Sequence, residues 1–325
     1  MKAVLLFLAA ALSLAALSAV PQKPPAPRVH LDPQFTPGMT LRYQIEFRTV
    51  TESKAEGPIE NPQAANQLEL TFSATVRLEV LRPVTPTPAK KSADAPQAPS
   101  LRLRATYEKC AVSVRGDAFD PAAGDLAEQY RRLEGRAVEF SLGPDKTIAN
   151  VTGLSDLPED QRAVANTQNW ITELARGVVM PKDGVLPGQT WKGDQPVAQA
   201  PLAGLAWRTE TTYLRDEPCQ PANVPEGKRT AGEVCAVLLT RFEMTQPDSS
   251  DPTPPDYRRR GLRTSGKMTG SGESLNYISL RTGHLVSATQ NVAQEMDLTI
   301  THLEADSRVH YAGRVTNRSN IALLK

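Results

Sequence analysis

The stretch Leu68–Val80 reads LELTFSATVRLEV and alternates without interruption between apolar and polar residues. A period of two places successive side chains on opposite faces of a β-strand, so this segment predicts a strand with one dry face and one wet face. Fully extended it spans about 43 Å, well beyond a common strand of roughly five or six residues. The candidate residues for the apolar face are Leu68, Leu70, Phe72, Val76 and Leu78.

The same alternation recurs along the chain. It is found in residues 41–47, 101–107, 205–213, 234–244 and 286–300. Near Lys109 the apolar phase changes from odd to even positions, which predicts a β-bulge. We therefore expect a mainly β (α+β) protein whose long strands form one or more large, curved antiparallel sheets.

Two helices are expected beside these strands. Asp120-Pro121 is typical of a helix start, and Leu126, Tyr130 and Leu133 follow at helical spacing within 121–134. Pro158 opens a second apolar stripe that continues to Arg176, before Gly177. Both helices are expected to pack on the sheet.

The chain suggests two similar halves. Pro37-Gly38-Met39-Thr40-Leu41 resembles Pro187-Gly188-Gln189-Thr190-Trp191, and a strand, turn, strand unit near 138–148 has a counterpart near 275–286. We expect a first β-rich half at 31–182, carrying both helices, and a second at 183–325, after a Pro-rich lead-in at 20–30. Convergent hairpin chemistry is the alternative explanation.

Residues 1–19 predict a secretory signal peptide, with Lys2, a short apolar run and small residues before a cleavage site at Ser18 or Ala19. No later stretch is long and apolar enough for a membrane span of about 20 residues. The expected location is the periplasm or the extracellular space.

Exported proteins form disulfides. Cys219 and Cys235 flank a polar, Pro-containing segment between two strand-like runs, so a bridge between them is expected. Cys110 is left over inside a strand pattern and is expected to be a small apolar residue rather than a reactive thiol.

Composition and motifs exclude several functions. Lys and Arg total 37 against 36 Asp and Glu, which argues against non-specific nucleic-acid binding. No zinc-ligand spacing, nucleophile elbow or phosphate loop occurs, so no catalytic, cofactor-binding or metal residue is assigned. The four His residues are expected at the surface or in turns, and residues 265–273 are expected to form a flexible turn. The basic run from Arg258 to Lys267 is expected to consist of solvated loop residues that compensate nearby Asp251 and Asp256, with anionic lipid or polysaccharide as the alternative contact.

Three motifs together resemble those of poorly characterised families of exported bacterial proteins. They are the entry at 37–43, the unit at 140–148 and Leu186-Pro187-Gly188-Gln189-Thr190-Trp191. The resemblance implies an architecture similar to the curved half-barrel of periplasmic lipoprotein carriers and related lipid-binding proteins. It implies no catalytic residue.

Three functional hypotheses follow. The first is a non-enzymatic exported binding protein that holds lipid or another apolar ligand in the concavity of the sheet. The second is a structural or protein-interaction module of the cell envelope, which would use sheet edges or Pro-rich loops. The third is a hydrolase whose residues have no recognisable motif.

Overall fold

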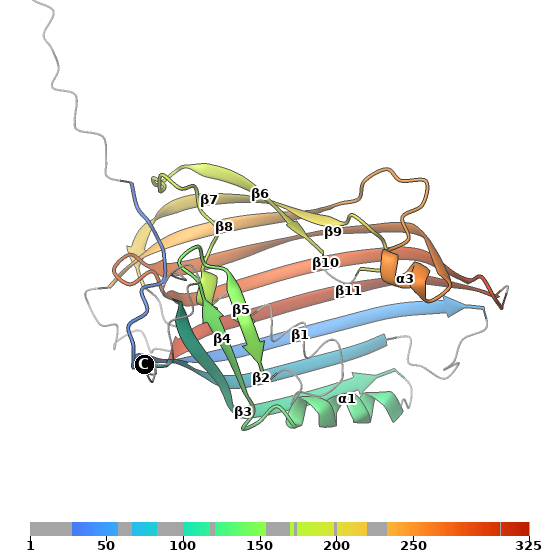
Figure 1. Cartoon of the computed structure of the whole chain (residues 1–325), viewed down its shortest axis with the longest axis horizontal. Helices are drawn as coiled ribbons and strands as arrows, with labels where there is room; N and C mark the ends of the chain where they lie inside the picture. The colour runs from blue at the N-terminus through green and yellow to red at the C-terminus, as the bar shows by residue number, and fades with distance from the viewer. Residues whose placement is uncertain are drawn as a thin grey trace, which may run out of the picture.

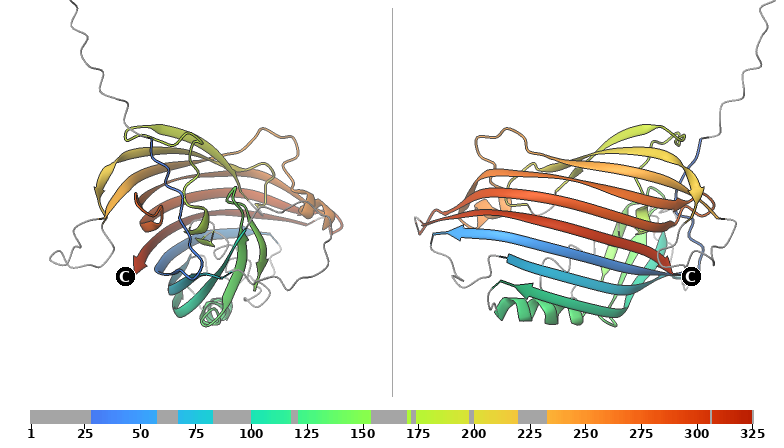
Figure 2. Two further views of the ribbon diagram at one scale, coloured as in Figure 1. Left: turned by 60° about the vertical axis from the view of Figure 1, so that its left-hand side comes forward. Right: turned by 180° about the vertical axis from the view of Figure 1, so that it is seen from behind.

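The computed structural model describes residues 28–57, 67–82, 100–117, 121–153, 170–171, 174–197, 200–219, 233–305 and 307–324. They form one antiparallel sheet of 11 strands, ordered β5-β4-β3-β2-β1-β11-β10-β9-β8-β7-β6. Figures 1 and 2 show that the sheet curls without closing. This is the mainly β architecture that the alternating pattern predicted. The expected signal peptide, most of the lead-in and most of the second helix lie outside the described residues.

The strands and helices are bounded as follows. They are β1 Thr40–Glu56, β2 Gln67–Val80, β3 Leu101–Gly116, α1 Pro121–Arg131, β4 Ala137–Leu142, β5 Ile148–Thr152, β6 Thr190–Pro196, β7 Ala206–Pro218, β8 Val234–Thr245, α3 Pro255–Arg259, β9 Leu262–Ser279, β10 Leu285–His302 and β11 Ser307–Leu324.

The alternation in β2 becomes alternating burial. Every even residue from Leu70 to Val80 is buried, and Leu68 is half-buried at the strand's outer end. In β3 the pairing register with β2 shifts between Thr75 and Val76, leaving Glu108 as an extra residue. The less exposed positions then change from odd numbers, where 103, 105 and 107 are buried, to even numbers, where 110, 112 and 114 are half-buried, as the phase change near Lys109 predicted.

An aromatic cluster joins α1 to the inner, concave face of the sheet. The ring of Tyr130 lies 5.0 Å from that of Phe72 and 5.8 Å from that of Phe47. Trp170, in a described fragment of the second expected helix, donates from Nε1 to the hydroxyl of Tyr107 at 2.6 Å. Both contacts bury aromatic surface, which makes this end of the inner face the main hydrophobic core.

The segment before β1 crosses one end of the sheet and packs on the turn between β9 and β10. Leu31 is 1% exposed, and the amide of Gln34 donates to Thr282 O at 2.9 Å. The ring of His284 stacks 5.3 Å from Phe35 and donates from Nε2 to Gln34 O at 3.0 Å. His284 lies in the turn between β9 and β10, as expected of a surface or turn residue, but it is only 4% exposed, and this burial was not predicted. The partner that buries it is distant in sequence.

Cys219 and Cys235 form the predicted disulfide, with a Cα–Cα distance of 4.9 Å. The bridge joins the end of β7 to the start of β8, and the amide of Cys219 donates to Glu233 O at 2.9 Å beside it. A disulfide is typical of oxidising compartments outside the cytoplasm.

The expectation of a flexible turn at 265–273 was wrong, because these residues lie inside the continuous strand β9. Their glycines meet close neighbours. A Cβ on Gly270 would lie 2.6 Å from the ring of Trp207, and one on Gly272 would lie 2.3 Å from Asn291 O. Glycine is therefore used here for close approach within a sheet.

Removing the disulfide should destabilise the protein. Replacing Cys219 and Cys235 together with Ala should lower the free energy of unfolding by about 3 kcal/mol, because a loop of this size then gains entropy in the unfolded chain. Urea denaturation with and without reductant measures the effect. The reductant should shift the midpoint of the wild type and leave that of the double variant alone; an unshifted wild type would contradict the prediction.

Stability should fall in mild acid through His284. Burial lowers the pKa of its imidazole, although the hydrogen bond to Gln34 O partly opposes this. The unfolded chain then binds a proton near pH 6.5 while the folded protein does so only at lower pH, so stability is lost as the pH drops below about 6.5. Urea midpoints at neutral and acid pH test this, and His284→Gln should flatten the dependence relative to wild type.

Candidate functional site

The inner face of the sheet carries no Lys, Arg, Asp or Glu in six of its described strands. Directly paired residues share a face, so the register assigns each position. Inner positions are odd-numbered at 41–55 in β1 and 309–323 in β11. They are even-numbered at 68–80 in β2, 236–244 in β8, 262–278 in β9 and 288–302 in β10. None of these residues is Lys, Arg, Asp or Glu, and His302 is the one titratable side chain among them with a basic group.

The outer face holds the charges instead, in cross-strand pairs. Arg48 binds Glu69 through two hydrogen bonds of 2.9 Å, which lower the pKa of that carboxyl. Arg102 and Arg104, both in β3, form ion pairs with Glu139 in the neighbouring strand β4. The arginines are exposed and the carboxylates partly exposed, so each pair adds little stability. Their main effect is to make one face of the sheet wet and leave the other dry.

A line of hydroxyl and amide side chains crosses the inner face of five consecutive strands. We call it the polar rung; it consists of Thr211, Thr240, Ser274, Gln290 and Ser319, each paired with the next. The hydroxyls of Thr211 and Thr240 lie 2.9 Å apart, and Ser319 Oγ donates to Gln290 Oε1 at 3.4 Å. The same line continues through Phe47 and Phe72, so it is polar on β7–β11 and aromatic on β1 and β2.

Asn276 lies beside the polar rung with an unused hydrogen-bonding atom. Its side chain donates to Ser274 Oγ at 3.3 Å, and it is 6% exposed. Its Oδ1 is buried and has no hydrogen-bond partner among the described residues. A buried acceptor without a partner costs about 1–3 kcal/mol, so a donor at this position would be favourable.

Apolar residues lie on both sides of the polar rung along the strands. The main core, with Tyr43, Val76 and Leu238, lies toward one end. A second cluster toward the other end contains Leu202, Leu205, Met244, Met268 and Leu298, with Trp207, Met296 and Tyr311 half-buried against it. The inner face is therefore apolar, then polar but uncharged, then apolar again.

The five candidate residues for the apolar face of β2 all lie on the inner face. Leu70, Phe72, Val76 and Leu78 are buried there, and Leu68 is half-buried. Cys110 is half-buried opposite Ala74, and burial raises the pKa of its thiol to about 12. The polar rung was missed, because its members become one line only when the register of five strands is known.

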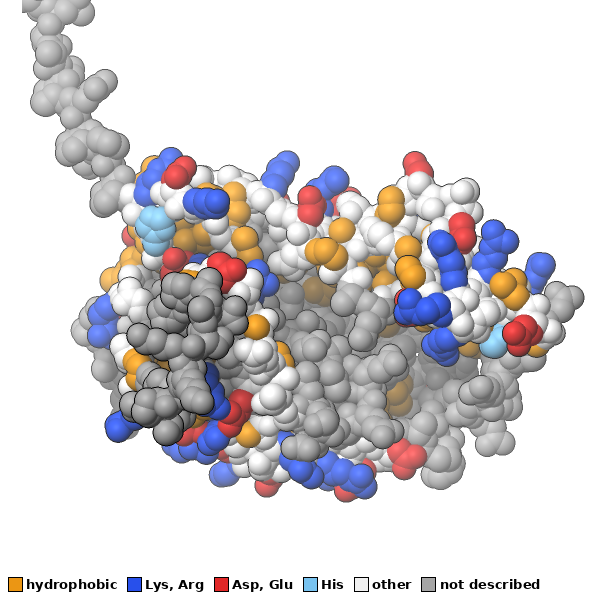
Figure 3. All heavy atoms as spheres, viewed as in Figure 1, with side chains coloured by type: hydrophobic (Ala, Val, Ile, Leu, Met, Phe, Trp, Pro, Cys, Tyr) orange, Lys and Arg blue, Asp and Glu red, His pale blue; other side chains and the backbone are white. Residues whose placement is uncertain are grey.

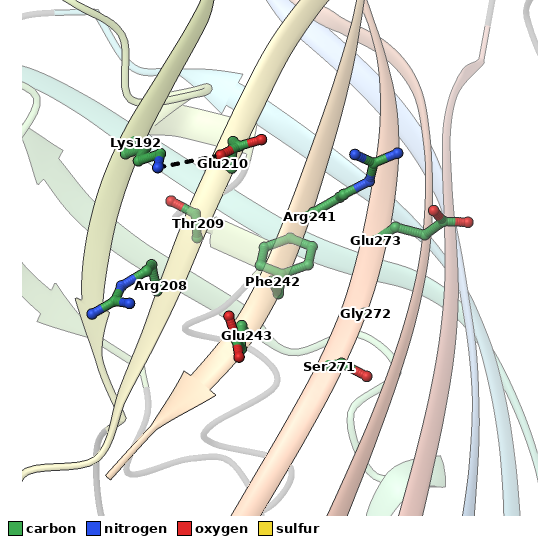
Figure 4. Close-up of a pocket in the computed structure, with 10 residues that line it drawn as sticks. All are labelled: Lys192, Arg208, Thr209, Glu210, Arg241, Phe242, Glu243, Ser271, Gly272 and Glu273. Atoms are coloured by element: carbon green, nitrogen blue, oxygen red, sulfur yellow. Dashed lines mark ion pairs between the residues drawn. The ribbon is translucent and has the colours of Figure 1, made fainter. Parts of the chain in front are cut away.

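A depression of about 710 Å³ lies over β6–β9, and Figure 4 shows the residues that line it. Its charged members are in balance, with Lys192, Arg208 and Arg241 against Glu210, Glu243 and Glu273. The register places Lys192, Glu210, Arg241 and Glu273 side by side, and Lys192 Nζ lies 3.5 Å from Glu210 Oε2. This alternating line offers no convergent charge to a ligand.

The described part of the chain was searched for metal-ligand groups and for membrane-spanning helices. No group of three or more His, Cys, Asp or Glu side chains there is placed to hold a metal ion. Within the same residues, no helix is long and apolar enough to cross a membrane.

Comparison with known proteins found no matching family model and no curated protein with significant sequence similarity.

A charge on the inner face should destabilise the protein, whereas the same charge one residue away should not. Gln290→Glu keeps the shape of a half-buried side chain but adds a carboxylate to a dry surface, which should cost about 1–3 kcal/mol of unfolding free energy. The control Asn291→Asp lies on the outer face opposite Arg318 and should change it by less than about 0.5 kcal/mol. Urea denaturation of both variants checks this; equal effects would contradict the inner-face assignment.

Proposed function

We propose that this is an exported, non-enzymatic protein that binds an uncharged lipid or another apolar ligand on the inner face of its curved sheet. The observation that carries the proposal is the absence of charged side chains from the inner face of β1, β2 and β8–β11. The half-barrel architecture implied by the sequence resemblance supports it at the level of fold.

Core packing alone does not account for that absence. Several inner positions are only half-buried, among them Thr49, Thr51, Gln294 and Asn317. At such positions Lys, Arg and Glu are ordinarily tolerated, because their charged ends reach water while their stems stay on the protein. Here every one of them is Thr, Asn, Gln, Ser or an apolar residue. An uncharged ligand in contact with these positions provides a physical reason for the restriction.

The polar rung supports an amphiphilic ligand over a pure hydrocarbon. Ligand sites are mostly apolar with a few polar groups that fix orientation. Gln290, Ser319 and the free Oδ1 of Asn276 supply hydroxyl and amide groups without charge, which suits a hydroxyl, ester or amide. The apolar clusters on either side suit hydrocarbon chains.

The first experiment is native mass spectrometry of the protein purified from an exporting host, followed by organic extraction and by incubation with a mixture of neutral lipids. A bound species at fixed stoichiometry is the expected result. A clean apo mass with no uptake from the mixture would overturn the proposal and favour the envelope interaction module.

Two isosteric variants, one on each face of the sheet, test which face binds the ligand. Asn317→Asp adds a charge at a half-buried inner position where Thr49 Oγ1 donates to Asn317 Oδ1 at 3.5 Å. It should weaken uptake of a fluorescent neutral lipid by about tenfold, because a carboxylate must be desolvated against the ligand. Asn320→Asp makes the same change at an exposed outer position of β11 and should bind as wild type. Equal binding by both variants would exclude the inner face.

A further inference from the structure

An exposed leucine surrounded by arginines forms the tip of the sheet where β10 turns into β11. We call this surface the tip patch; it consists of Arg259, Arg260, Arg263, Leu303 and Arg308. Leu303 is 60% exposed, among the most exposed large apolar side chains of the described residues. Its amide donates to Gly261 O at 3.0 Å, which fixes the β10–β11 turn against the end of α3.

The four arginines are exposed and none forms an ion pair among the described residues. Arg263 and Arg308 both pair with Thr301 in the sheet, so they lie on either side of it on one face. Arg260 lies 5.8 Å from the ring centre of Tyr257 in α3. Figure 3 shows the blue side chains gathered at this end of the molecule.

Acidic residues neutralise only part of this positive charge. Asp251 is paired with Arg258, at 3.5 Å, and its carboxylate also interacts electrostatically with Arg263, so it offsets part of the charge of the tip patch. Asp256 and Glu304 are exposed nearby. The segment 251–267 holds five basic residues against two acidic ones, in a chain whose overall net charge is +1. Compensation of the basic run by Asp251 and Asp256 therefore accounts for Arg258 and part of the charge of Arg263, and leaves the rest of the tip patch positive.

We propose that the tip patch docks the protein onto a membrane surface that contains anionic lipids. Arginines attract anionic headgroups, and an exposed aliphatic side chain among them enters the boundary between headgroups and acyl chains. The leucine favours a membrane over an acidic polymer, which offers no apolar layer.

The position of the tip patch links it to the proposed function, on which this inference rests. The inner face of β10 runs from Met296 through Leu298 and Ile300 to His302, and the turn with Leu303 follows directly. Docking would therefore bring the second apolar cluster to the membrane surface, where a lipid enters or leaves.

Vesicle flotation tests the proposal with the full-length mature protein. Wild type should float with vesicles of phosphatidylcholine and phosphatidylglycerol, should not float with phosphatidylcholine alone, and should be released by high salt. The double variant Arg260→Gln/Arg263→Gln should bind the anionic vesicles at least tenfold more weakly. The control Arg136→Gln/Arg318→Gln removes two exposed arginines that also lack ion pairs among the described residues, and it should bind as wild type.

Three outcomes would overturn the proposal: no flotation of wild type, equal loss in the control, or a Leu303→Ser variant that binds vesicles and dextran sulfate as wild type does. The last result would assign the patch to acidic polymers. Uptake of fluorescent neutral lipid from detergent solution is measured on the same variants. Unchanged uptake with lost flotation separates docking from ligand binding, whereas absent uptake in wild type would overturn the proposed function itself.

Discussion

The ladder between β1 and β11 joins the two ends of the described chain at the centre of the sheet. It runs in unbroken register from Arg42 and Leu324 to Glu56 and His310. On one side β2–β5 follow, and on the other β10–β6, so the two blocks share an inner face only through this ladder. A slip of one residue would turn Arg48 or Arg318 inward, because the side-chain period of a strand is two. The uncharged inner face thus depends on this one register.

The division of charge between the two faces has a physical consequence for binding. On the outer face, exposed pairs such as Arg48 and Glu69 keep a large sheet in water without adding much stability. On the inner face, hydroxyls and amides form hydrogen bonds to each other, as Thr211 does with Thr240. Such groups pay a smaller desolvation penalty than ions when a ligand covers them. The inner face can therefore be partly polar and still accept an apolar partner.

Local patterns predicted the local features. The alternation at Leu68–Val80 identified β2, the phase change near Lys109 located the bulge at Glu108, and the spacing of Cys219 and Cys235 identified the disulfide. Features that depend on distant pairing were not predictable. In the sequence, the glycines of β9 indicate a turn. In the fold, Trp207 and Asn291 lie so close to them that no larger residue fits. Likewise His284 is buried by a segment 250 residues away, which no local pattern reports.

Because the overall charge is close to zero, local patches of charge determine how the protein is oriented at an anionic surface. A strongly basic protein would be drawn to any anionic surface in any orientation, but here the net charge is +1. At physiological salt, electrostatic attraction acts over roughly 8–10 Å, so an approaching anionic surface interacts with one patch at a time. In the proposed docking, the arginines at the tip favour one orientation, with Leu303 foremost and the strands rising from the surface. In that orientation the second apolar cluster is closest to the lipid, and the polar rung lies beyond it along the same strands. Under the proposed function, a neutral amphiphile that enters at the tip would meet an apolar wall first and hydrogen-bonding groups next, so selection for an uncharged polar group would follow after the hydrocarbon has left the membrane.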